Sequence, residues 1–199
     1  MSFRKEKKYR LTPSDLLVLS STLKKYGMRQ IHKTRIVSSI YFDTLQNDLF
    51  WQSEEGILPR KKIRIRWYNK LDNYTLEKKI SSIEGRFKFS DELKNIVSLN
   101  DLYQKNLFDK DYGNLVPTLE VSYQRSYYVY NKIRFTFDSD IKYKSLISNS
   151  KVFYRDFENV VEIKVPIFCS DDFIEKQMPN PIERFSKYCR GINICNRYY

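Results

Sequence analysis

Polar and hydrophobic residues alternate strictly along residues 61–67, which read Lys-Lys-Ile-Arg-Ile-Arg-Trp. In an extended strand, successive side chains point to opposite faces. The two isoleucines and the tryptophan therefore share one face, and Lys62, Arg64 and Arg66 share the other. A row of like charges repels itself, so three cations on one strand face indicate that an anion binds there. The alternative is an exposed basic edge strand, whose charge prevents pairing with other chains.

The same alternation predicts strands in other parts of the chain. Their polar positions hold Arg, Lys and Glu in strand after strand, with few Ser, Thr or Gln. Turns are expected at residues 43–44 and 69–73. The predicted strands span residues 3–11, 37–42, 61–68, 74–80, 86–89, 118–130, 133–140 and 160–165.

One helix is predicted directly after the first strand. Thr12 is its expected N-cap, with Pro13 at the first helical position and Asp15 at the third, and Gly27 ends it. A helix of this kind buries residues spaced three or four apart. Its expected apolar stripe is Leu16, Leu19, Leu23 and Tyr26.

Three further segments show helix signals, and residues 46–52 fit no single pattern. Ser90 is a candidate cap for a helix to about residue 97, and residues 100–107 also have a helical pattern. Asn180, followed by a proline, predicts a helix to about residue 190, which Gly191 stops.

Composition predicts one soluble domain over residues 1–199 and a polyanionic partner. Hydrophobic residues make up 41% of the chain and charged residues 30%, which is typical of globular proteins. The 36 basic and 24 acidic residues give a net charge of +12. Such an excess predicts binding to nucleic acid, an anionic membrane or phosphate compounds.

Several function classes are disfavoured by particular residues. His32 is the only histidine, which argues against a Ser-His-Asp triad or a histidine metal site. The three cysteines, at positions 169, 189 and 195, fit no metal-ligand spacing and predict reduced thiols in a cytoplasmic protein. Neither a signal peptide nor an apolar run of about 18 residues is visible, so no membrane span is expected.

A face rich in Arg, Lys and Glu and an opposite apolar face favour one architecture. We predict an α+β fold in which antiparallel strands curl into a closed barrel, with helices packed on the apolar outside and the charged side lining a tunnel. Cations buried in a tunnel are costly unless an anion fills it, and carboxylates among them would hold a divalent cation against phosphate oxygens. The alternative is an open sheet whose solvated basic face binds RNA.

A set of motifs occurs in a characteristic order along nearly the whole chain. The motifs fall at residues 39–44 (Ser-Ile-Tyr-Phe-Asp-Thr), 62–68, 76–79, 123–125, 134–138, 161–164 and 185–188. In this order they resemble the VTC domain, the catalytic module of the vacuolar transporter chaperone polyphosphate polymerase and its bacterial relatives. That domain belongs to the triphosphate tunnel metalloenzymes of the CYTH superfamily. The resemblance implies a tunnel of about eight antiparallel strands.

The resemblance also implies an activity and its residues. The family moves the γ-phosphoryl group of ATP onto an inorganic polyphosphate chain, without a protein nucleophile and with a manganese-type divalent ion (Mn²⁺ or Mg²⁺). Glu162 matches the metal-binding glutamate, and Arg64, Arg66 and Lys187 join it as catalytic residues. No specific nucleic acid is expected, and the sequence indicates no oligomeric state. The residues expected to bind phosphate or nucleotide are Lys8, Arg64, Arg66, Lys79, Lys88, Arg125, Arg134 and Lys187.

Three of these assignments depend on details of the fold. Lys88 has the same parity as Arg86, and Arg125 has the parity of Val121 and Tyr123, so Arg125 reaches the tunnel only if a bulge intervenes or the apolar face is interrupted. Lys187 requires a terminal helix over the tunnel mouth. Structural rather than catalytic roles are expected for six other residues. Tyr41 is expected in the core and Asp43 in a turn, and four carboxylates are expected to balance the charge of the tunnel cations. Those carboxylates are Glu6, Glu77, Glu120 and Asp138.

The carboxylate pattern departs from that of metal-dependent triphosphatases in the same superfamily, which favour Glu-x-Glu pairs. Here the first strand reads Glu6-Lys7-Lys8 and the late strand Glu162-Ile163-Lys164. Because these two strands carry fewer carboxylates and more cations than a Glu-x-Glu pair, they favour binding of a polyanion over activation of water. The pattern therefore favours a polymerase over a hydrolase. A metal-dependent triphosphatase and a non-catalytic polyphosphate- or RNA-binding module remain the alternatives.

Overall fold

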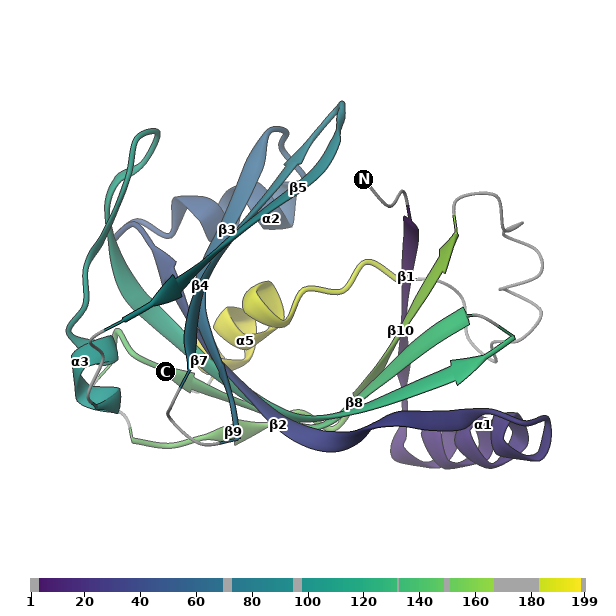
Figure 1. Ribbon diagram of the computed structural model, residues 1–199. Helices are drawn as coiled ribbons and strands as arrows, with labels where there is room; N and C mark the ends of the chain where they lie inside the picture. Colours follow the sequence, from purple (N-terminus) through teal and green to yellow (C-terminus); the bar gives the residue numbers. More distant parts are fainter. Residues whose placement is uncertain are drawn as a thin grey trace. The chain divides into compact units, whose positions relative to one another are not determined.

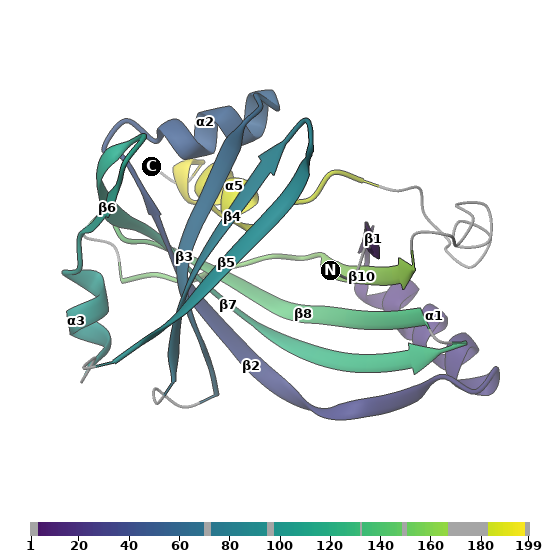
Figure 2. The ribbon, with the colours of Figure 1, turned by 45° about the horizontal axis from the view of Figure 1, so that its top comes forward.

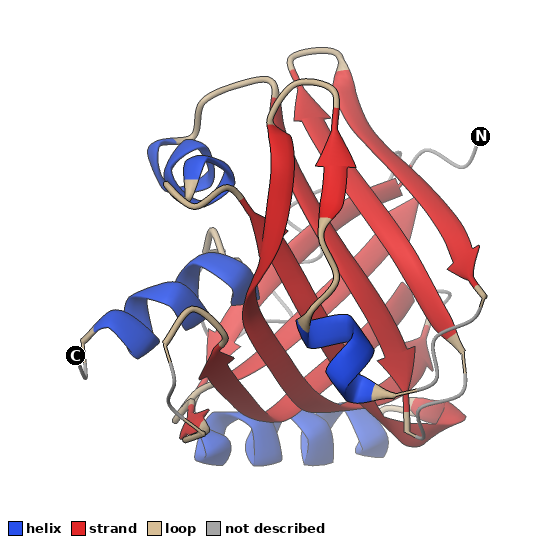
Figure 3. Cartoon of the chain, turned by 90° about the vertical axis from the view of Figure 1, so that its left-hand side faces the viewer, coloured by secondary structure: helices blue, strands red, loops and turns tan. Residues whose placement is uncertain are grey.

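Strands dominate the structure, a computed structural model that describes residues 4–69, 73–94, 98–131, 133–148, 151–166 and 183–197 (Figures 1 and 3). The helices are α1 (Pro13–Lys25), α2 (Asp48–Glu55), α3 (Leu99–Tyr103) and α5 (Lys187–Asn196). The strands are β1 (Arg4–Leu11), β2 (Arg29–Asp43), β3 (Arg60–Tyr68), β4 (Tyr74–Ser82), β5 (Gly85–Leu93), β6 (Leu107–Asp109), β7 (Gly113–Tyr130), β8 (Ile133–Ser145), β9 (Tyr154–Arg155) and β10 (Asn159–Pro166).

The strands pair in the order β1-β10-β8-β7-β2-β3-β4-β5, with β6 beside β7 and β9 beside β8. The registers given for β1–β10, β10–β8, β2–β3, β3–β4 and β4–β5 are all antiparallel. In Figure 2, β3, β4 and β5 lie side by side as these registers require. The predicted antiparallel sheet with accompanying helices is confirmed. Closure of the sheet into a barrel stays a prediction.

The chain divides into two compact units. Unit 1 comprises Met1–Ile36, Tyr123–Ile141 and Arg155–Phe185, and unit 2 comprises Val37–Ser122, Lys142–Tyr154 and Ser186–Tyr199. Strands β2, β7 and β8 each contribute residues to both units. That residues 1–199 form one domain stays a prediction.

In unit 1, α1 packs on the apolar face of the strands. The hydroxyl of Thr12 accepts the backbone N–H of Asp15 at 3.1 Å, which is the predicted cap. Leu19 and Leu23 are buried with aromatic and β-branched residues of β1, β8 and β10. Tyr26, predicted to be part of this stripe, is 68% exposed. The chain turns at Gly27 (φ 94°), and Met28 is buried at the end of the helix in its place.

In unit 2, the alternation of β3 sorts its side chains as predicted. Ile63, Ile65 and Trp67 are buried in an apolar core with residues of β2, α2 and α3. Arg64 and Arg66 point to the opposite face, yet only 9% and 8% of their surfaces are exposed. Both faces of β3 are therefore covered, and the cations lie in the interior of this unit.

The structure contradicts two predicted helices over part of their length. Residues 90–93 belong to β5, because its register with β4 continues through Ser90 opposite Glu77 to Leu93 opposite Tyr74. Residues 95–97 of that predicted helix lie outside the described residues. Of the segment 100–107, only the first part is helical, and Leu107 begins β6.

The C-terminal helix begins later and continues further than predicted. Ser186 caps α5 by accepting the N–H of Cys189, and the helix runs through Gly191 to Asn196. Gly191 lies inside the helix, at a position where a Cβ would be 2.5 Å from the ring of Tyr143 and 2.6 Å from Leu119. The glycine permits close packing instead of ending the helix. The predicted start at residues 180–182 lies outside the described residues, as do positions 70–72 of the predicted turn.

Candidate functional site

Arg64 is held in a fixed orientation at the centre of unit 2. It lies opposite Tyr41 of β2 and Glu77 of β4, so all three side chains share one sheet face. Its Nε and Nη2 atoms donate to Oε2 of Glu77 at 2.7 and 2.5 Å, and its Nη1 atom donates to the hydroxyl of Tyr41 at 2.8 Å. Three donors of the guanidinium thus have partners on the neighbouring strands.

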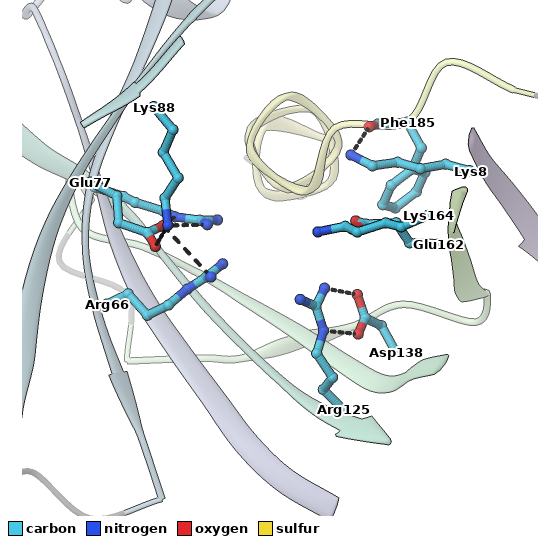
Figure 4. A network of polar contacts seen from close by, with 10 residues as sticks. Lys8, Arg66, Glu77, Lys88, Arg125, Asp138, Glu162, Lys164 and Phe185 are labelled. Carbon is cyan, nitrogen blue, oxygen red and sulfur yellow. Dashed lines mark hydrogen bonds and ion pairs between the residues drawn. The ribbon is translucent and has the colours of Figure 1, made fainter. Parts of the chain in front are cut away.

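Glu77 lies in the middle of this cation cluster (Figure 4). Besides Arg64, it contacts Nη1 of Arg66 at 3.6 Å and Nζ of Lys88 at 2.6 Å. Burial raises the pKa of Glu77, but the charges of Arg64 and Arg66 and the hydrogen bond from Lys88 outweigh it and lower that pKa to about 2. Three cations around one carboxylate leave a net positive cluster that favours an anionic ligand.

The hairpin of β4 and β5 extends this face. Lys79 lies opposite Lys62 of β3 on one side and opposite Lys88 of β5 on the other. The side chain of Lys88 is half exposed and still reaches Glu77, so it lies on the site face together with Arg86, which has the same parity. The predicted cations Arg64, Arg66, Lys79 and Lys88 are therefore brought together on one face of unit 2.

Helix α5 lies against the same face. The ring of Tyr188 stacks on the ring of Tyr41 at 4.9 Å, and its hydroxyl donates to the buried carboxylate of Asp43. Nζ of Lys62 donates to the α5 cap residue Ser186 at 2.7 Å. These contacts place Lys187, the first residue of α5, near the phenol of Tyr41. Whether the helix lies over the mouth of a tunnel stays a prediction.

The phenol of Tyr41 is surrounded by positive charge. Burial raises its pKa, but the charges of Arg64, Arg66 and Lys187 and the hydrogen bond from Arg64 outweigh burial and lower the pKa to about 8. Tyr41 is only 6% exposed. It is thus buried as predicted, but as a polar member of the cation cluster and not of the apolar core.

Asp43 organises the start of α2. Its carboxylate accepts the backbone N–H groups of Thr44, Leu49 and Phe50 at 2.8, 2.9 and 2.9 Å. Burial raises the pKa of Asp43 despite these hydrogen bonds and the one from Tyr188. This buried carboxylate therefore ties β2, α2 and α5 together, which is more than the simple turn that was predicted.

Glu162 is the centre of a second cluster, which lies in unit 1. It pairs in register with Lys8 of β1 and Thr136 of β8, and its Oε1 atom lies 3.0 Å from Nζ of Lys164. Burial raises the pKa of Glu162. A hydrogen bond with Glu6 and the charges of Lys8, Lys164 and Arg125 outweigh burial and hold that pKa well below the ordinary value. Glu162 is therefore an ionised, buried carboxylate.

Arg125 reaches the polar face of unit 1 without leaving its parity. Its Nε and Nη2 atoms donate to the two oxygens of Asp138 at 2.5 and 2.6 Å (Figure 4). Asp138 shares its face with Glu162, because Glu162 pairs in register with Thr136, which lies two positions before Asp138 on β8. The face of β7 that bears Tyr123 and Arg125 is thus polar at Arg125, which meets the second of the two conditions given for this residue; that Arg125 binds phosphate stays a prediction. Asp138 balances this cation, as expected.

The remaining unit 1 cations lie at the edges of the cluster. Nζ of Lys8 donates to the carbonyl oxygen of Phe185 at 3.3 Å. Arg134 lies opposite Lys164 in register but is exposed to solvent. Unit 1 therefore contains four of the nine predicted site residues, Lys8, Arg125, Arg134 and Glu162, and unit 2 contains the other five.

A metal ion could be held here by few protein ligands. Among the described residues, no three His, Cys, Asp or Glu side chains gather closely enough to hold a metal ion. Glu162 and Glu6 supply hard oxygen donors on one face, and such donors suit Mg²⁺ or Mn²⁺ when phosphate oxygens and water complete the coordination. The donor set fits a divalent ion that is shared with a phosphate ligand.

Three residues of the clusters were not among the predicted site residues. Lys164 contacts Glu162, Glu77 orients Arg64, and Tyr41 accepts a hydrogen bond from Arg64. A signal for each exists in the sequence. Lys164 and Glu77 have the parity of the predicted cations, and Tyr41 occupies a polar-face position of its strand.

The cysteines and the helices bear on the sequence predictions about thiols and membrane spans. Cys189 and Cys195 are buried free thiols, and Cys169 lies outside the described residues. Within the part of the chain that the structure describes, no helix combines the length and apolar character needed to cross a bilayer.

The fold matches solved structures over almost its full length. A candidate adenylate cyclase from Bacillus halodurans has a TM-score of 0.60 at 15% identity and covers 95% of this chain and 97% of its own. A Pyrococcus horikoshii protein has a TM-score of 0.56 at 15% identity, covering 98% and 100%. A candidate adenylyl cyclase from Hippeastrum, described as having a dominant triphosphatase activity, has a TM-score of 0.51 at 16% identity, covering 94% and 95%.

These three structures share the fold of this chain. The VTC domain family matches residues 3–196, and the chain belongs to that family. No curated protein matches the chain significantly.

Proposed function

We propose that the chain is a phosphotransferase that moves the γ-phosphoryl group of ATP onto an inorganic polyphosphate chain. The observation that carries the proposal is the balance of charges in the two clusters. Glu77 is surrounded by Arg64, Arg66 and Lys88. Glu162 is subject to the charges of three other cations in unit 1. Such clusters favour a ligand with many negative charges over a neutral substrate, and membership of the VTC family supports the same conclusion.

Phosphoryl transfer requires little from the protein except alignment and neutralisation of charge. A terminal phosphate oxygen of the polyphosphate chain attacks the γ-phosphorus of ATP, the bond to the β–γ bridging oxygen breaks, and ADP leaves. Arg64 and Arg66 present planar donor forks that match phosphate oxygens. Lys187 adds a point charge at the start of α5. No side chain needs to become covalently modified.

Glu162, assisted by Glu6, is the group that would hold a divalent ion, Mn²⁺ or Mg²⁺. When bound, the ion would neutralise charge on phosphate oxygens. Lys8 and Lys164 lie beside the same carboxylate and would bind phosphate oxygens next to the ion. Because Glu162 is ionised, it offers this charge across the neutral pH range.

A triphosphatase is the second candidate, and one observation favours it. Glu6 and Glu162 lie diagonally across the β1–β10 register on one face, and paired carboxylates can orient a water molecule for attack. Against it, each carboxylate of this pair has a lysine opposite it in register, Lys164 and Lys8 respectively. A non-catalytic module that binds polyphosphate or RNA is the third candidate.

Incubation of the purified protein with ATP and Mn²⁺, followed by a gel stained for polyphosphate, separates these candidates. The proposal expects polymer from the wild type and none from Glu162→Gln. Glu84→Gln, which removes the same charge from an exposed turn, should retain synthesis. Phosphate release without polymer would support the triphosphatase. Tight, salt-sensitive binding without turnover would support the binding module.

A further inference from the structure

Two buried hydroxyl groups in the clusters have no hydrogen-bond partner among the described residues. They are Oγ of Ser39 on β2 and Oγ1 of Thr136 on β8. Ser39 is 1% exposed and Thr136 is 9% exposed. A buried polar group without a partner is costly and uncommon, so each of these hydroxyls requires an explanation.

Each hydroxyl lies directly opposite a charged residue of its cluster. Ser39 pairs in register with Arg66, and Thr136 pairs with Glu162. Directly opposed side chains on antiparallel strands share a face and have Cβ atoms about 4.5–5.5 Å apart. Both hydroxyls are therefore aimed at the face that bears the cations of their own unit.

Hydroxyls on the neighbouring positions of unit 2 do have partners. Ser38 precedes Ser39 and points to the opposite face, where it donates to the hydroxyl of Ser122 at 3.3 Å. Thr118 donates to the carbonyl oxygen of Tyr41 at 3.1 Å. The sheet thus satisfies hydroxyls that have a structural role. Ser39 differs from Ser38 in the face that it occupies, since Ser38 pairs with Trp67 and Ser39 with Arg66.

We propose that each of the two hydroxyls, of Ser39 and of Thr136, donates one hydrogen bond to a non-bridging phosphate oxygen held by the cation cluster of its own unit. The inference rests on the proposed function, because it takes the same anionic ligand. A hydroxyl donor adds no charge and needs no counter-ion in the ligand-free protein, whereas each buried cation needs one. The two hydroxyls therefore fix the position of phosphate oxygens that the cations attract.

The inference predicts that removing either hydroxyl does not destabilise the ligand-free protein. Thermal unfolding with and without tripolyphosphate tests this prediction. Removing an unpartnered hydroxyl deletes a desolvation cost and no bond, so Ser39→Ala and Thr136→Val should have a ligand-free Tm equal to or above that of the wild type. Their affinity for tripolyphosphate should be lower by roughly ten-fold each, the lower end expected for a hydrogen bond to a charged group. The increase in Tm caused by the ligand should shrink accordingly.

Ser38→Ala is the matched control for Ser39→Ala, since it is the same substitution one residue away on the other face. It should lower the ligand-free Tm and leave tripolyphosphate affinity unchanged. The inference is overturned for a hydroxyl whose variant lowers the ligand-free Tm and binds tripolyphosphate as the wild type does, because that hydroxyl is then structural. Normal tripolyphosphate binding by a wild type that makes no polymer would contradict the proposed reaction and leave this inference standing. A wild type that does not bind tripolyphosphate would contradict both.

Discussion

Arg64 and Glu77 lie directly opposite each other on β3 and β4, joined by two charge-assisted hydrogen bonds of 2.7 and 2.5 Å. Both residues are buried, and the remaining Nη1 atom of Arg64 donates to Tyr41. Breaking a buried pair by removing one partner leaves an uncompensated charge in the interior. The pair therefore fixes the guanidinium in place and makes Glu77 the counter-charge of the whole unit 2 cluster.

Glu77 should make the protein sensitive to acid. Its pKa in the folded chain is about 2, below the ordinary 4.5, so the unfolded chain takes up the proton first as the pH falls. The carboxylate stabilises the fold fully above pH 4.5, by about 3 kcal/mol, and this contribution is lost as the pH falls toward 2. Urea unfolding at several pH values should show Glu77→Gln less stable than the wild type at pH 7, with a difference that narrows in acid. A difference that stays constant would contradict this assignment.

Arg66 should contribute to ligand affinity through its position and not only through its charge. Arg66→Ala should weaken tripolyphosphate binding by about ten- to a hundred-fold, because hydrogen bonds to charged groups contribute about 1.5–3 kcal/mol. Lys33→Ala removes the same charge from an exposed position of β2 and should change affinity by about two-fold or less at a fixed ionic strength. Titration calorimetry compares the two variants. Equal losses would mean that net charge alone attracts the ligand.

Tyr41 should ionise at a lower pH than an ordinary tyrosine. Its pKa of about 8 lies below the usual 10, because three nearby cations favour the phenolate. The unfolded chain keeps this proton up to pH 10, so the contribution of Tyr41 to the free energy of unfolding should rise between pH 8 and 10 by about 3 kcal/mol. Absorbance of tyrosinate during an alkaline titration checks this. The early step should disappear in Tyr41→Phe, and its persistence would assign it to another tyrosine.

Gly191 should be intolerant of any side chain. A methyl group there would lie 2.5 Å from the ring of Tyr143 and 2.6 Å from Leu119, so α5 or these two side chains would have to shift. Gly191→Ala should lower the free energy of unfolding by about 1–3 kcal/mol, although alanine favours helix formation. Asn193→Ala changes an exposed position of the same helix and should cost about 0.5 kcal/mol or less. Chemical denaturation measures both. A stabilised Gly191→Ala variant would show that α5 packs less closely.

Periodicity predicts much of this structure from the sequence. The strict alternation of residues 61–67 places Arg64 and Arg66 opposite the apolar core, and the Thr12 cap fixes the start of α1. These features are local, since they depend on side-chain direction in a strand and on hydrogen bonds within one turn. The cations of β3, β4 and β5 could therefore be grouped on one face without knowing how distant segments pack.

Tertiary contacts explain what the sequence did not indicate. Glycine often ends a helix, so the sequence predicts a stop at Gly191. Only the packing of Tyr143 and Leu119 against α5 shows why a glycine lies inside the helix. Serine often caps a helix, so the sequence predicts a helix start at Ser90, but pairing with β4 keeps Ser90 in a strand. Tyrosine is common in protein cores, so the sequence predicts a core position for Tyr41. Its place in the cation cluster depends on the hydrogen bond from Arg64, which lies 23 positions away along the chain.

The fate of the γ-phosphate of ATP tests the central claim most directly. With γ-labelled ATP, Mn²⁺ and a short polyphosphate primer, the account predicts that the label enters polymer in step with the appearance of ADP. Arg64→Ala should lose this transfer. Recovery of the label only as free orthophosphate, in amounts equal to the ADP formed, would contradict the account and show that water is the acceptor.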